Sequence, residues 1–388
     1  MHILKVADKY SESEFYEFPA RLYRKDGHWV PTKPEEIERI FATENNIFFE
    51  RDDVCRWILQ NYRGATIGRI AAFVNREESA EAGYLAFFEC IDHETAAWQL
   101  LEEGALWLKE RGASMVHAPV NPTSLFLKSG LLTEGFDEPP AYGSNYHQAY
   151  YQQFFESFGF QPHLQQRTYH LDFQTLPFPR TIKKRAELVV NNEDFRIDRF
   201  RKDKLEALAK DITLVYNRTW SKTPFYRALS VQQIQNELQE LMPWIDENIF
   251  ILAYYQDQPI GFFFNLPDIN QARLRAGNGL LSKVREAYFR KRKHKHLLSV
   301  LLGVLPEFQQ RGVGSAMIKT LLDFLSKYEV PYDKIETNRV SKGQTAAEYL
   351  LQQFKGEPHQ HYWIYRKSLL ATARSEPVSQ KPAALKRQ

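Results

Sequence analysis

The sequence predicts a tandem of two related α/β units, each with a mixed central sheet and helices on its faces. Three pairs of segments repeat at the same or nearly the same distance of 193 residues. They are the strand residues Ile67-Gly68 and Ile260-Gly261, the closing-strand residues Tyr169 and Tyr362, and the opening strands near Ile3 and Arg196. One distance shared by three pairs indicates an internal duplication.

The order of elements within each half agrees with this duplication. An opening strand leads to helices, two or three strands, a further strand, an amphipathic helix, a short strand, and finally a closing helix and strand. The further strand covers 83–90 and 297–304, the amphipathic helix 94–111 and 312–328, and the short strand 114–118 and 334–337. Many strands and few helices favour one central sheet for each half, separate from that of the other half.

The chain divides into four stretches on this basis. We expect a first unit over 1–175, a linker over 176–192 and a second unit over 193–370. The linker, with Pro177, Pro179 and the charge run Lys183-Lys184-Arg185, does not fit the pattern of a helix or strand. Residues 371–388, rich in Ala, Ser, Pro and Gln, are predicted to be a disordered tail.

The composition is that of a folded globular protein and disfavours several classes of function. The chain has 388 residues, 43% of them hydrophobic and 26% charged, which is enough for two cores. A net charge of +3 gives little support for nucleic-acid binding. Cys55 and Cys90 alone provide neither a disulfide framework nor a cysteine metal site. Without a signal peptide or a run of ~20 apolar residues, a cytoplasmic location is expected.

The segment from Leu297 to Ile318 combines a buried strand, a turn with Pro306, and a helix start holding Gly312 and Gly314. Glycine lets a ligand approach the backbone, and the first N–H groups of a helix lack intrahelical partners. Together with the positive end of the helix dipole, these donors form a phosphate site, to which Arg311 adds charge. The segment therefore predicts a pyrophosphate-binding loop.

This loop, Gln309-Gln310-Arg311-Gly312-Val313-Gly314, resembles the Gln/Arg-x-x-Gly-x-Gly/Ala loop of the GNAT superfamily of acyl-CoA N-acyltransferases. The resemblance implies that the loop binds coenzyme A and that pantetheine lies where the preceding strand splays from its neighbour. It also implies that the N–H of Leu302 polarises the thioester carbonyl and that acetyl-CoA or a longer acyl-CoA is the co-substrate. The cofactor-binding residues it implies are Val304, through its N–H, and Gln309, Gln310, Arg311, Gly312, Val313, Gly314 and Ser315.

The resemblance covers about residues 1–370 and points to a bacterial group of long two-unit GNAT proteins. It rests on segments such as Trp29-Val30-Pro31, Asn121-Pro122, Gly130-Leu131-Leu132-Thr133 and Asp268-Ile269-Asn270-Gln271. Some members of this group are thought to N-acylate long-chain sphingoid bases, which implies ceramide-type lipids as one product class.

The first half is expected to be a degenerate copy without a CoA loop. At the matching place it has Cys90-Ile91-Asp92-His93-Glu94, with no glycine and with two carboxylates where phosphates would lie. Like charges at such short range repel each other. Asp92 and Glu94 also suit a plain helix start, and under both interpretations the phosphate site is lost.

Three residues are candidates for the proton transfers of acyl transfer or for the thioester carbonyl. Glu336, on the short strand beside the splay, is the candidate base, with a salt-bridged or edge position as the alternative. Tyr349 is the candidate acid, although it is out of register with the family's tyrosine, and a buried packing role is the alternative. Leu302 contributes only its main-chain N–H. Glu307, at the strand exit, is expected to face solvent.

Several polar residues are candidates for acceptor binding. Asp268 and Asn270 follow the Ile260-Gly261 strand at the edge where acceptors commonly enter, and ordinary turn chemistry explains them equally well. In the first half, Asn121, Tyr142, Asn145 and Tyr146 are expected to reach a cleft shared by the two units.

The basic run and the histidines give weaker signals. Arg285 and the run Arg290 to His296 fit a solvated face, with attraction of anionic lipid headgroups or an acyl-carrier protein as the alternative. The pairs His294/His296 and His359/His361 are isolated in sequence, so no metal site is predicted.

The predicted function is N-acyl transfer from acyl-CoA to an amine by direct attack in a ternary complex. The acceptor is predicted to be lipid-like or bulky, because the insertion Ser124 to His147 is rich in apolar side chains that could roof an apolar channel. The alternative is that these side chains only hold the two units together. They are Leu125, Phe126, Leu127, Leu131, Leu132 and Phe136. At most peripheral membrane contact is expected. The alternatives are a non-catalytic acyl-CoA-binding or partner-docking protein, and a Fem-like aminoacyl transferase.

Overall fold

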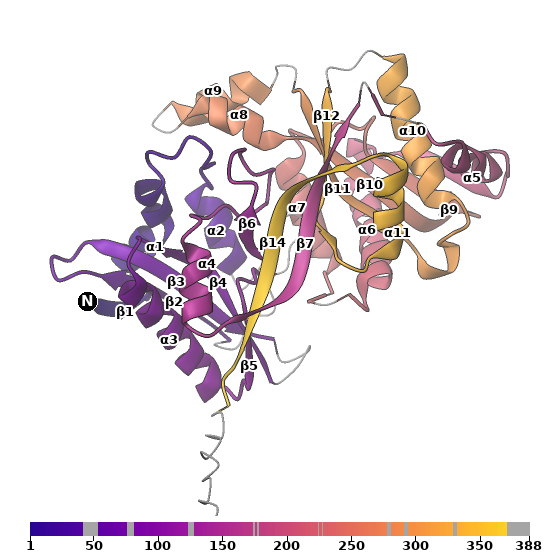
Figure 1. Ribbon diagram of the computed structural model, residues 1–388. Coiled ribbons are helices and arrows are strands. Elements are labelled where there is room, and N and C mark those ends of the chain that lie inside the picture. The colour runs from indigo at the N-terminus through magenta and orange to yellow at the C-terminus, as the bar shows by residue number, and fades with distance from the viewer. Residues whose placement is uncertain are drawn as a thin grey trace, which may run out of the picture.

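The protein is described by a computed structural model that covers residues 1–41, 53–75, 81–122, 128–173, 175–176, 178–223, 225–226, 228–277, 281–290, 294–328 and 332–370. Two α/β units lie side by side and are bridged by two long strands, β7 (Gln161–Asp172) and β14 (Glu357–Ser368) (Figure 1). The two-unit fold predicted from the internal repeat is therefore confirmed.

The elements of the first half follow the predicted order closely. Helix α1 (Lys9–Leu22) begins with a capping box. The Asp8 carboxylate accepts from the N–H of Ser11, and the Ser11 hydroxyl oxygen accepts from the N–H of Asp8. The strands are β1 (His2–Lys5), β2 (Val54–Gln60), β3 (Thr66–Val74), β4 (Ala82–Cys90), β5 (Met115–Ala118), β6 (Leu131–Glu134) and β7 (Gln161–Asp172), and the helices are α1 (Lys9–Leu22), α2 (Pro34–Phe41), α3 (Glu94–Glu110) and α4 (Tyr151–Ser157).

The second half repeats this order and adds two helices. The added helices, α8 (Ile269–Ala276) and α9 (Ser282–Arg290), lie between β10 and β11. The other elements are β8 (Phe195–Arg199), α6 (Leu205–Trp220), α7 (Val231–Leu241), β9 (Ile251–Tyr255), β10 (Gln258–Pro267), β11 (His296–Val304), α10 (Val313–Lys327), β12 (Lys334–Thr337), β13 (Val340–Ser341), α11 (Thr345–Gln353) and β14 (Glu357–Ser368), with short 3₁₀ turns at Lys202–Lys204 and Pro306–Phe308.

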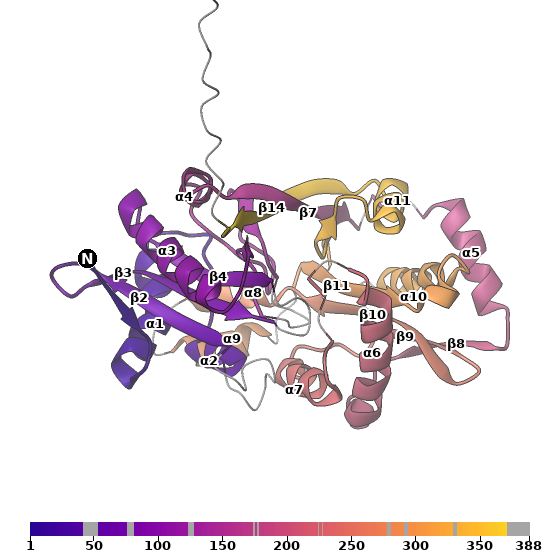
Figure 2. The same ribbon diagram turned by 90° about the horizontal axis from the view of Figure 1, so that it is seen from below.

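The two halves do not have separate sheets, which corrects the expectation from sequence. The described strands form one sheet in the order β1-β2-β3-β4-β5-β14-β7-β12-β11-β10-β9-β8. The closing strands are exchanged: β7 of the first half pairs with β12, and β14 of the second half pairs with β5. The two closing strands also pair with each other (Figure 2).

The hydrophobic cores follow this exchange. The two cores of the first unit lie on opposite faces of its sheet, one under α3 and α4 and one under α1 and α2. Tyr365 of β14 is buried in the first of these cores and Ile364 in the second. Leu171 of β7 packs against the core of the second unit. Each unit therefore completes its core with a strand from the other half of the chain.

The segment predicted to be an irregular linker contains a helix, α5 (Arg180–Val190). Ile182, Ala186 and Val189 of α5 are buried in the core of the second unit. Their spacing is that of one helical face, and Pro179 lies directly before the first helical residue. The prediction of a linker without an element is wrong for this reason, and residues 371–388 lie outside the described structure.

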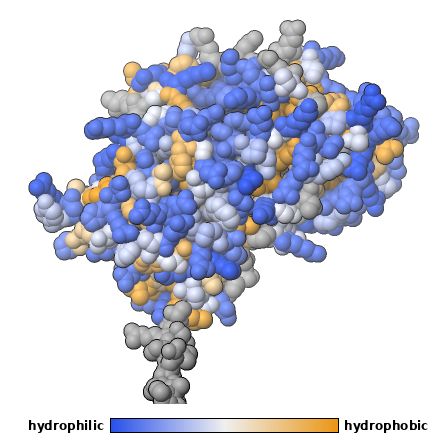
Figure 3. All heavy atoms as spheres, in the orientation of Figure 1, coloured by the Kyte–Doolittle hydropathy of each residue, from blue (hydrophilic) through white to orange (hydrophobic). Residues whose placement is uncertain are grey.

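The face of the molecule seen in Figure 3 is mostly hydrophilic, with apolar side chains in small groups. Among the described residues, every helix is too short or too polar to cross a membrane.

Candidate active site

Strands β11 and β12 splay apart in the second unit. They pair in parallel from His296 with Lys334 to Ser299 with Thr337, and the N–H of Asn338 then donates to the Ser299 carbonyl at 2.8 Å. Strand β11 continues to Val304, and beyond Ser299 its register is with β10. A gap therefore opens beside the last five residues of β11.

The amides of Leu302 and Val304 face this gap. The N–H of Leu305 donates to the Ile260 carbonyl of β10 at 2.9 Å. Because successive amides of a strand point to opposite sides, the N–H groups of Val304 and Leu302 point away from β10. This orientation suits the main-chain roles predicted for both residues, which stay predictions.

The loop after β11 turns sharply at Gly312, which caps α10 with a left-handed φ of +93°. A Cβ at Gly312 would overlap the main-chain carbonyl of Arg185 in α5. At Gly314 a Cβ would lie 4.0 Å from the side chains of Leu302 and Val304, on the side of the splayed strand. Gly312 is thus required by the fold, whereas Gly314 leaves the space that a ligand needs.

The other predicted loop residues divide by exposure. Gln309, Gln310 and Arg311 are exposed, and Gln309 Nε2 donates to the Val304 carbonyl at 3.0 Å. Val313 and Ser315 are buried, so only their main-chain N–H groups are available to a phosphate. Glu307 is exposed and pairs with Arg218 at 2.7 Å, as expected for a residue facing solvent.

Helix α5 adds basic side chains beside this loop. Lys183, Lys184 and Arg185 are exposed, and the Arg185 main chain contacts Gly312. Sequence reasoning noted this charge run but placed it in a linker. The packing of α5 on α10 brings the main chain of this run next to the predicted phosphate loop.

At the corresponding place in the first unit, the start of α3 is already capped. The His93 side chain accepts from the N–H of Ala96 at 3.2 Å, and Asp92 and Glu94 beside it are exposed. A capping side chain and two carboxylates thus occupy the position that corresponds to Gly312 and Gly314 in the second unit. The prediction that this unit binds no CoA agrees with that arrangement and has not been tested.

Glu336 lies in a buried polar layer at the base of the splay. Its residue is 7% exposed, one carboxylate oxygen lies 3.6 Å from Nε2 of His170, and the other has no hydrogen-bond partner among the described residues. His170 is directly opposite Glu336 in the β7–β12 pair. The salt-bridged alternative is thus realised in part, and the role of Glu336 as base stays a prediction.

Asp268 and Asn270 connect the second unit to the insertion of the first. The carboxylate of Asp268 caps α8 by accepting from the N–H of Asn270 at 3.1 Å, and it also accepts from the N–H of Tyr142 at 3.3 Å. Burial, reinforced by the charge of Glu336, raises the pKa of Asp268 to about 7. Asn270 Nδ2 donates to the Pro140 carbonyl at 2.8 Å. Capping of α8 and contacts with the insertion therefore account for the hydrogen bonds of these two residues, and their role in acceptor binding stays a prediction.

A cavity of about 560 Å³ lies between the two units. Its walls come from α1, α2 and β4 of the first unit, from the insertion, and from α7, α8 and α9 of the second unit. All four residues predicted to reach a shared cleft line it, namely Asn121, Tyr142, Asn145 and Tyr146.

Ion pairs between α2 and the second unit lie along the cavity wall. Arg273 of α8 pairs with Glu36 and lies 3.9 Å from Glu286, and Lys33 pairs with Glu286 at 2.9 Å. Arg39 pairs with Glu240 at 2.6 Å. Seven glutamates and five lysines or arginines are among the lining residues, together with apolar side chains such as Trp29, Phe87 and Leu241. The lining is thus amphipathic with an excess of carboxylates.

A buried carboxylate of the first unit also faces this cavity. Glu89 on β4 accepts hydrogen bonds from Tyr23 and, at 2.9 Å, from Tyr151, and Arg69 lies 3.9 Å away. Burial raises the pKa of Glu89 to about 6. Sequence reasoning missed this cluster, although a glutamate inside the apolar strand 83–90 was the available signal.

A small second cavity lies at the apex of the splay, next to the first. Its lining includes Leu298 and Val300 of β11, and it shares Tyr142 and Ser144 with the large cavity. Lys128 and Arg339 also line it. Burial lowers the pKa of Lys128 to about 7, and Arg339 stacks on the Tyr362 ring at 3.4 Å. These two cations were not predicted from sequence.

The remaining candidates lie elsewhere or only partly within the described residues. Tyr349 on α11 is 40% exposed, so its predicted role as a buried packing residue is wrong, and its role as acid stays a prediction. Leu131 and Leu132 are buried in β6 and do not roof a channel, while Leu125, Phe126 and Leu127 lie outside the described residues. In the basic run, His294 is buried and Lys295 pairs with Asp333, so the run is not a uniformly solvated face, and residues 291–293 lie outside the description.

The splayed strands, the glycine loop and the duplicated α/β order define the class of protein. Residues 212–356 match the Acetyltransferase (GNAT) family. The fold is similar to that of a tandem GNAT protein from the clavulanic acid biosynthesis pathway, at 9% identity and a TM-score of 0.54. The similarity covers 96% of this chain and 99% of that chain. The second unit is therefore similar to the GNAT family, whose members use acyl-CoA as co-substrate, and the two-unit fold is similar to that of a tandem GNAT protein.

Relatives and a further solved structure agree with this class. The chain is 24% identical over 372 residues to Protein YghO of Escherichia coli, covering 92% of each chain. It is 23% identical over 384 residues to a bacterial ceramide synthase of Caulobacter vibrioides, covering 95% of this chain and 98% of the relative. A probable N-acyltransferase from Enterococcus faecalis is similar in fold over 95% of this chain and 72% of that chain, at 9% identity and a TM-score of 0.52. In general terms these findings support an N-acyltransferase.

Proposed function

We propose that the protein transfers an acyl group from acyl-CoA to the amine of a lipid-like acceptor. The observation that carries this proposal is that the small cavity at the splay of β11 and β12 and the large cavity between the units share Tyr142 and Ser144 in their walls. Acyl-CoA enters along the splay with its pyrophosphate at the start of α10, and the acceptor enters from the cavity. The two substrates then meet near Tyr142 and Ser144.

The lining of the cavity suits an amine attached to an apolar body. Carboxylates in excess favour a cationic amine, and apolar side chains beside them favour a hydrocarbon part. A volume of about 560 Å³ is within the range of small-molecule sites. Similarity to a bacterial ceramide synthase over nearly the whole chain supports a long-chain amine as acceptor class.

The reaction needs no covalent enzyme intermediate in this proposal. The amine nitrogen attacks the thioester carbon, the carbon–sulfur bond breaks, and CoA leaves as a thiolate that takes up a proton. The N–H of Leu302 stabilises the charge that develops on the carbonyl oxygen. The proton released by the amine goes to the buried carboxylate layer of Glu336 and Asp268.

The test is an acyl-transfer assay with a grid of donors and acceptors. The donors are acetyl-CoA, palmitoyl-CoA and a palmitoylated acyl-carrier protein, and the acceptors are short polar amines, a lysine peptide and long-chain amines. Thiol release and mass spectrometry of the amide products are measured together. We expect the fastest transfer with a long-chain amine and an acyl-CoA.

Other outcomes separate the alternatives. Preference for the lysine peptide with acetyl-CoA would contradict a lipid-like acceptor. CoA binding without transfer to any amine would favour a non-catalytic acyl-CoA-binding protein. Transfer from the carrier protein alone would replace CoA as donor.

A further inference from the structure

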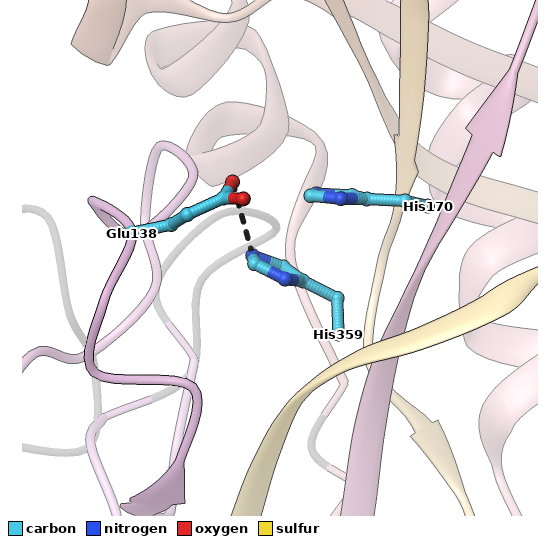
Figure 4. A group of neighbouring side chains, drawn as sticks. All are labelled: Glu138, His170 and His359. Carbon is cyan, nitrogen blue, oxygen red and sulfur yellow. Dashed lines mark ion pairs between the residues drawn. The ribbon is translucent and has the colours of Figure 1, made fainter.

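Three potential metal ligands meet at the joint between the two units. They are Glu138 of the insertion, His170 of β7 and His359 of β14, and their ligand atoms all lie within 4.8 Å of one another. Figure 4 shows the Glu138 carboxylate directed toward both imidazole rings. The three residues come from three distant parts of the sequence, so the spacing of histidines along the chain does not indicate that they meet.

The strand exchange creates this meeting point. In the β7–β14 pair, His170 is opposite Glu357, and the register shifts between Pro358 and His361. This irregularity frees His359 from the regular alternation of the strand, and its ring stacks on that of His170 with centroids 3.7 Å apart and an interplanar angle of 22°. Both imidazoles thus lie on the face that the insertion covers.

The polar atoms of this group are poorly satisfied by the protein itself. Nε2 of His359 is buried without a hydrogen-bond partner among the described residues, and its nearest carboxylate oxygen, on Glu138, is 3.9 Å away. Glu336 lies 3.6 Å from Nε2 of His170 and also retains an unpartnered oxygen. Buried polar atoms without partners are costly and call for a ligand, an ion or water.

We propose that Glu138, His170 and His359 bind a zinc ion. Two imidazoles and one carboxylate match the ligand preference of Zn²⁺, whereas Mg²⁺ and Ca²⁺ prefer oxygen ligands alone. Glu336 beside His170 is the type of second carboxylate that orients a metal-bound histidine. The earlier expectation of no metal depended on His359 being isolated, and in the fold it is not.

The site requires only side-chain movement to reach coordination distances. Tetrahedral ligands at ~2.1 Å from zinc are about 3.4 Å apart. The present separations, all within 4.8 Å, therefore have to shorten by at most ~1.4 Å, and the stacked rings have to turn so that their lone pairs converge. Glu138 is on a loop with a side chain 43% exposed, so it can close on the two histidines.

The ion would cross-link the insertion of the first half to both exchanged strands. This zinc cross-link stabilises the wall between the splay and the cavity, and the ion takes no part in acyl transfer. It stands independently of the proposed acyl-transfer activity.

The test uses the full-length protein without a histidine tag, freed of metal with a chelator. Zn²⁺ is titrated by calorimetry, and Co²⁺ is titrated by absorption spectroscopy to report on ligand geometry. We expect one Zn²⁺ per chain and a melting temperature that rises with zinc concentration. His170→Ala and His359→Ala should each weaken zinc binding at least ~100-fold, and Glu138→Gln at least ~10-fold.

His361→Ala is the matched control. His361 lies two residues beyond His359 in the same strand and faces Glu134 at 2.7 Å. We expect wild-type zinc affinity in this variant. Glu138→Gln, at a half-exposed side chain, keeps the test valid where a histidine variant fails to fold. Absence of stoichiometric zinc binding in the wild type, or affinity unchanged by Glu138→Gln and His359→Ala, would overturn the site.

Discussion

At the scale of single residues, the two positions of the predicted phosphate loop, 312 and 314, are glycine for different physical reasons. Gly312 has a left-handed backbone and lies against the main chain of α5, so both conformation and packing exclude a side chain. Gly314 has an ordinary backbone, and the space beside it faces the splayed strand. A substitution at Gly314 therefore tests ligand binding without disturbing the fold, whereas a substitution at Gly312 does not.

Gly314→Asp is expected to weaken CoA binding at least ~10-fold, because the carboxylate repels the pyrophosphate. The fold should persist, since a Cβ at this position makes ordinary contacts and an acidic residue suits the first turn of α10. Titration calorimetry with CoA and thermal unfolding measure the two effects. Gly312→Ala is the comparison and is expected to lower the melting temperature. Wild-type CoA affinity in Gly314→Asp would contradict the site.

Glu89 predicts a particular dependence of stability on pH. Its folded-state pKa of about 6 is above its ordinary value of 4.5, so the folded protein retains a proton that the unfolded chain releases. The stabilisation is fully present below pH 4.5 and is lost as the pH rises through 6, by about 2 kcal/mol.

Glu89→Gln removes this titration. Urea unfolding of wild type and variant at several pH values between 4 and 7 should show the variant gaining relative stability as the pH rises through that window. A difference in unfolding free energy that does not change with pH would show that Glu89 does not titrate there.

At the scale of elements, α5 changes the surroundings of the CoA loop. Its apolar face packs into the second core, and the Arg185 main chain contacts Gly312. The exposed Lys183 and Lys184 directly precede Arg185 in the same helix. The packing of α5 therefore fixes the part of the chain that carries these charges next to the predicted phosphate loop.

The double variant Lys183→Glu/Lys184→Glu is expected to weaken CoA binding by about 3- to 10-fold, and less at high salt, because exposed charges are screened. Calorimetry at two salt concentrations, with CoA and with dephospho-CoA, measures the effect and shows which phosphate is involved. Lys9→Glu, an exposed lysine on α1 of the first unit, is the charge control. Equal affinities in wild type and double variant would exclude α5 from the site.

At the scale of the whole molecule, the exchanged strands make the two units dependent on each other. Strand β14 pairs with β5 and buries Ile364 and Tyr365 in the cores of the first unit. Strand β7 pairs with β12 and completes the sheet of the second unit. We therefore expect the two units to fold and unfold together.

Ending the chain at residue 356 removes β14 and should destabilise the first unit, although that unit lies at the other end of the sequence. The loss leaves an unpaired sheet edge and opens two cores. Circular dichroism, thermal unfolding and hydrogen exchange of residues 82–118 measure the effect. A chain ending at Leu370 is the control. Native exchange rates in the first unit of the shorter chain would refute this interdependence.

Local patterns in the sequence determined the duplication, the element order and the glycine-containing turn before α10. Alternating and helical periodicities, Pro306, and the glycines at 312 and 314 act within a few consecutive residues, so no long-range information is needed. The tertiary structure alone decided the strand exchange, the packing of α5 and the meeting of Glu138, His170 and His359. Because β7 and β14 hold corresponding places in the two halves, local periodicity does not indicate which sheet each strand joins. Which edge each strand joins depends on contacts between residues far apart in the chain, and every group of side chains at the joint depends on that choice.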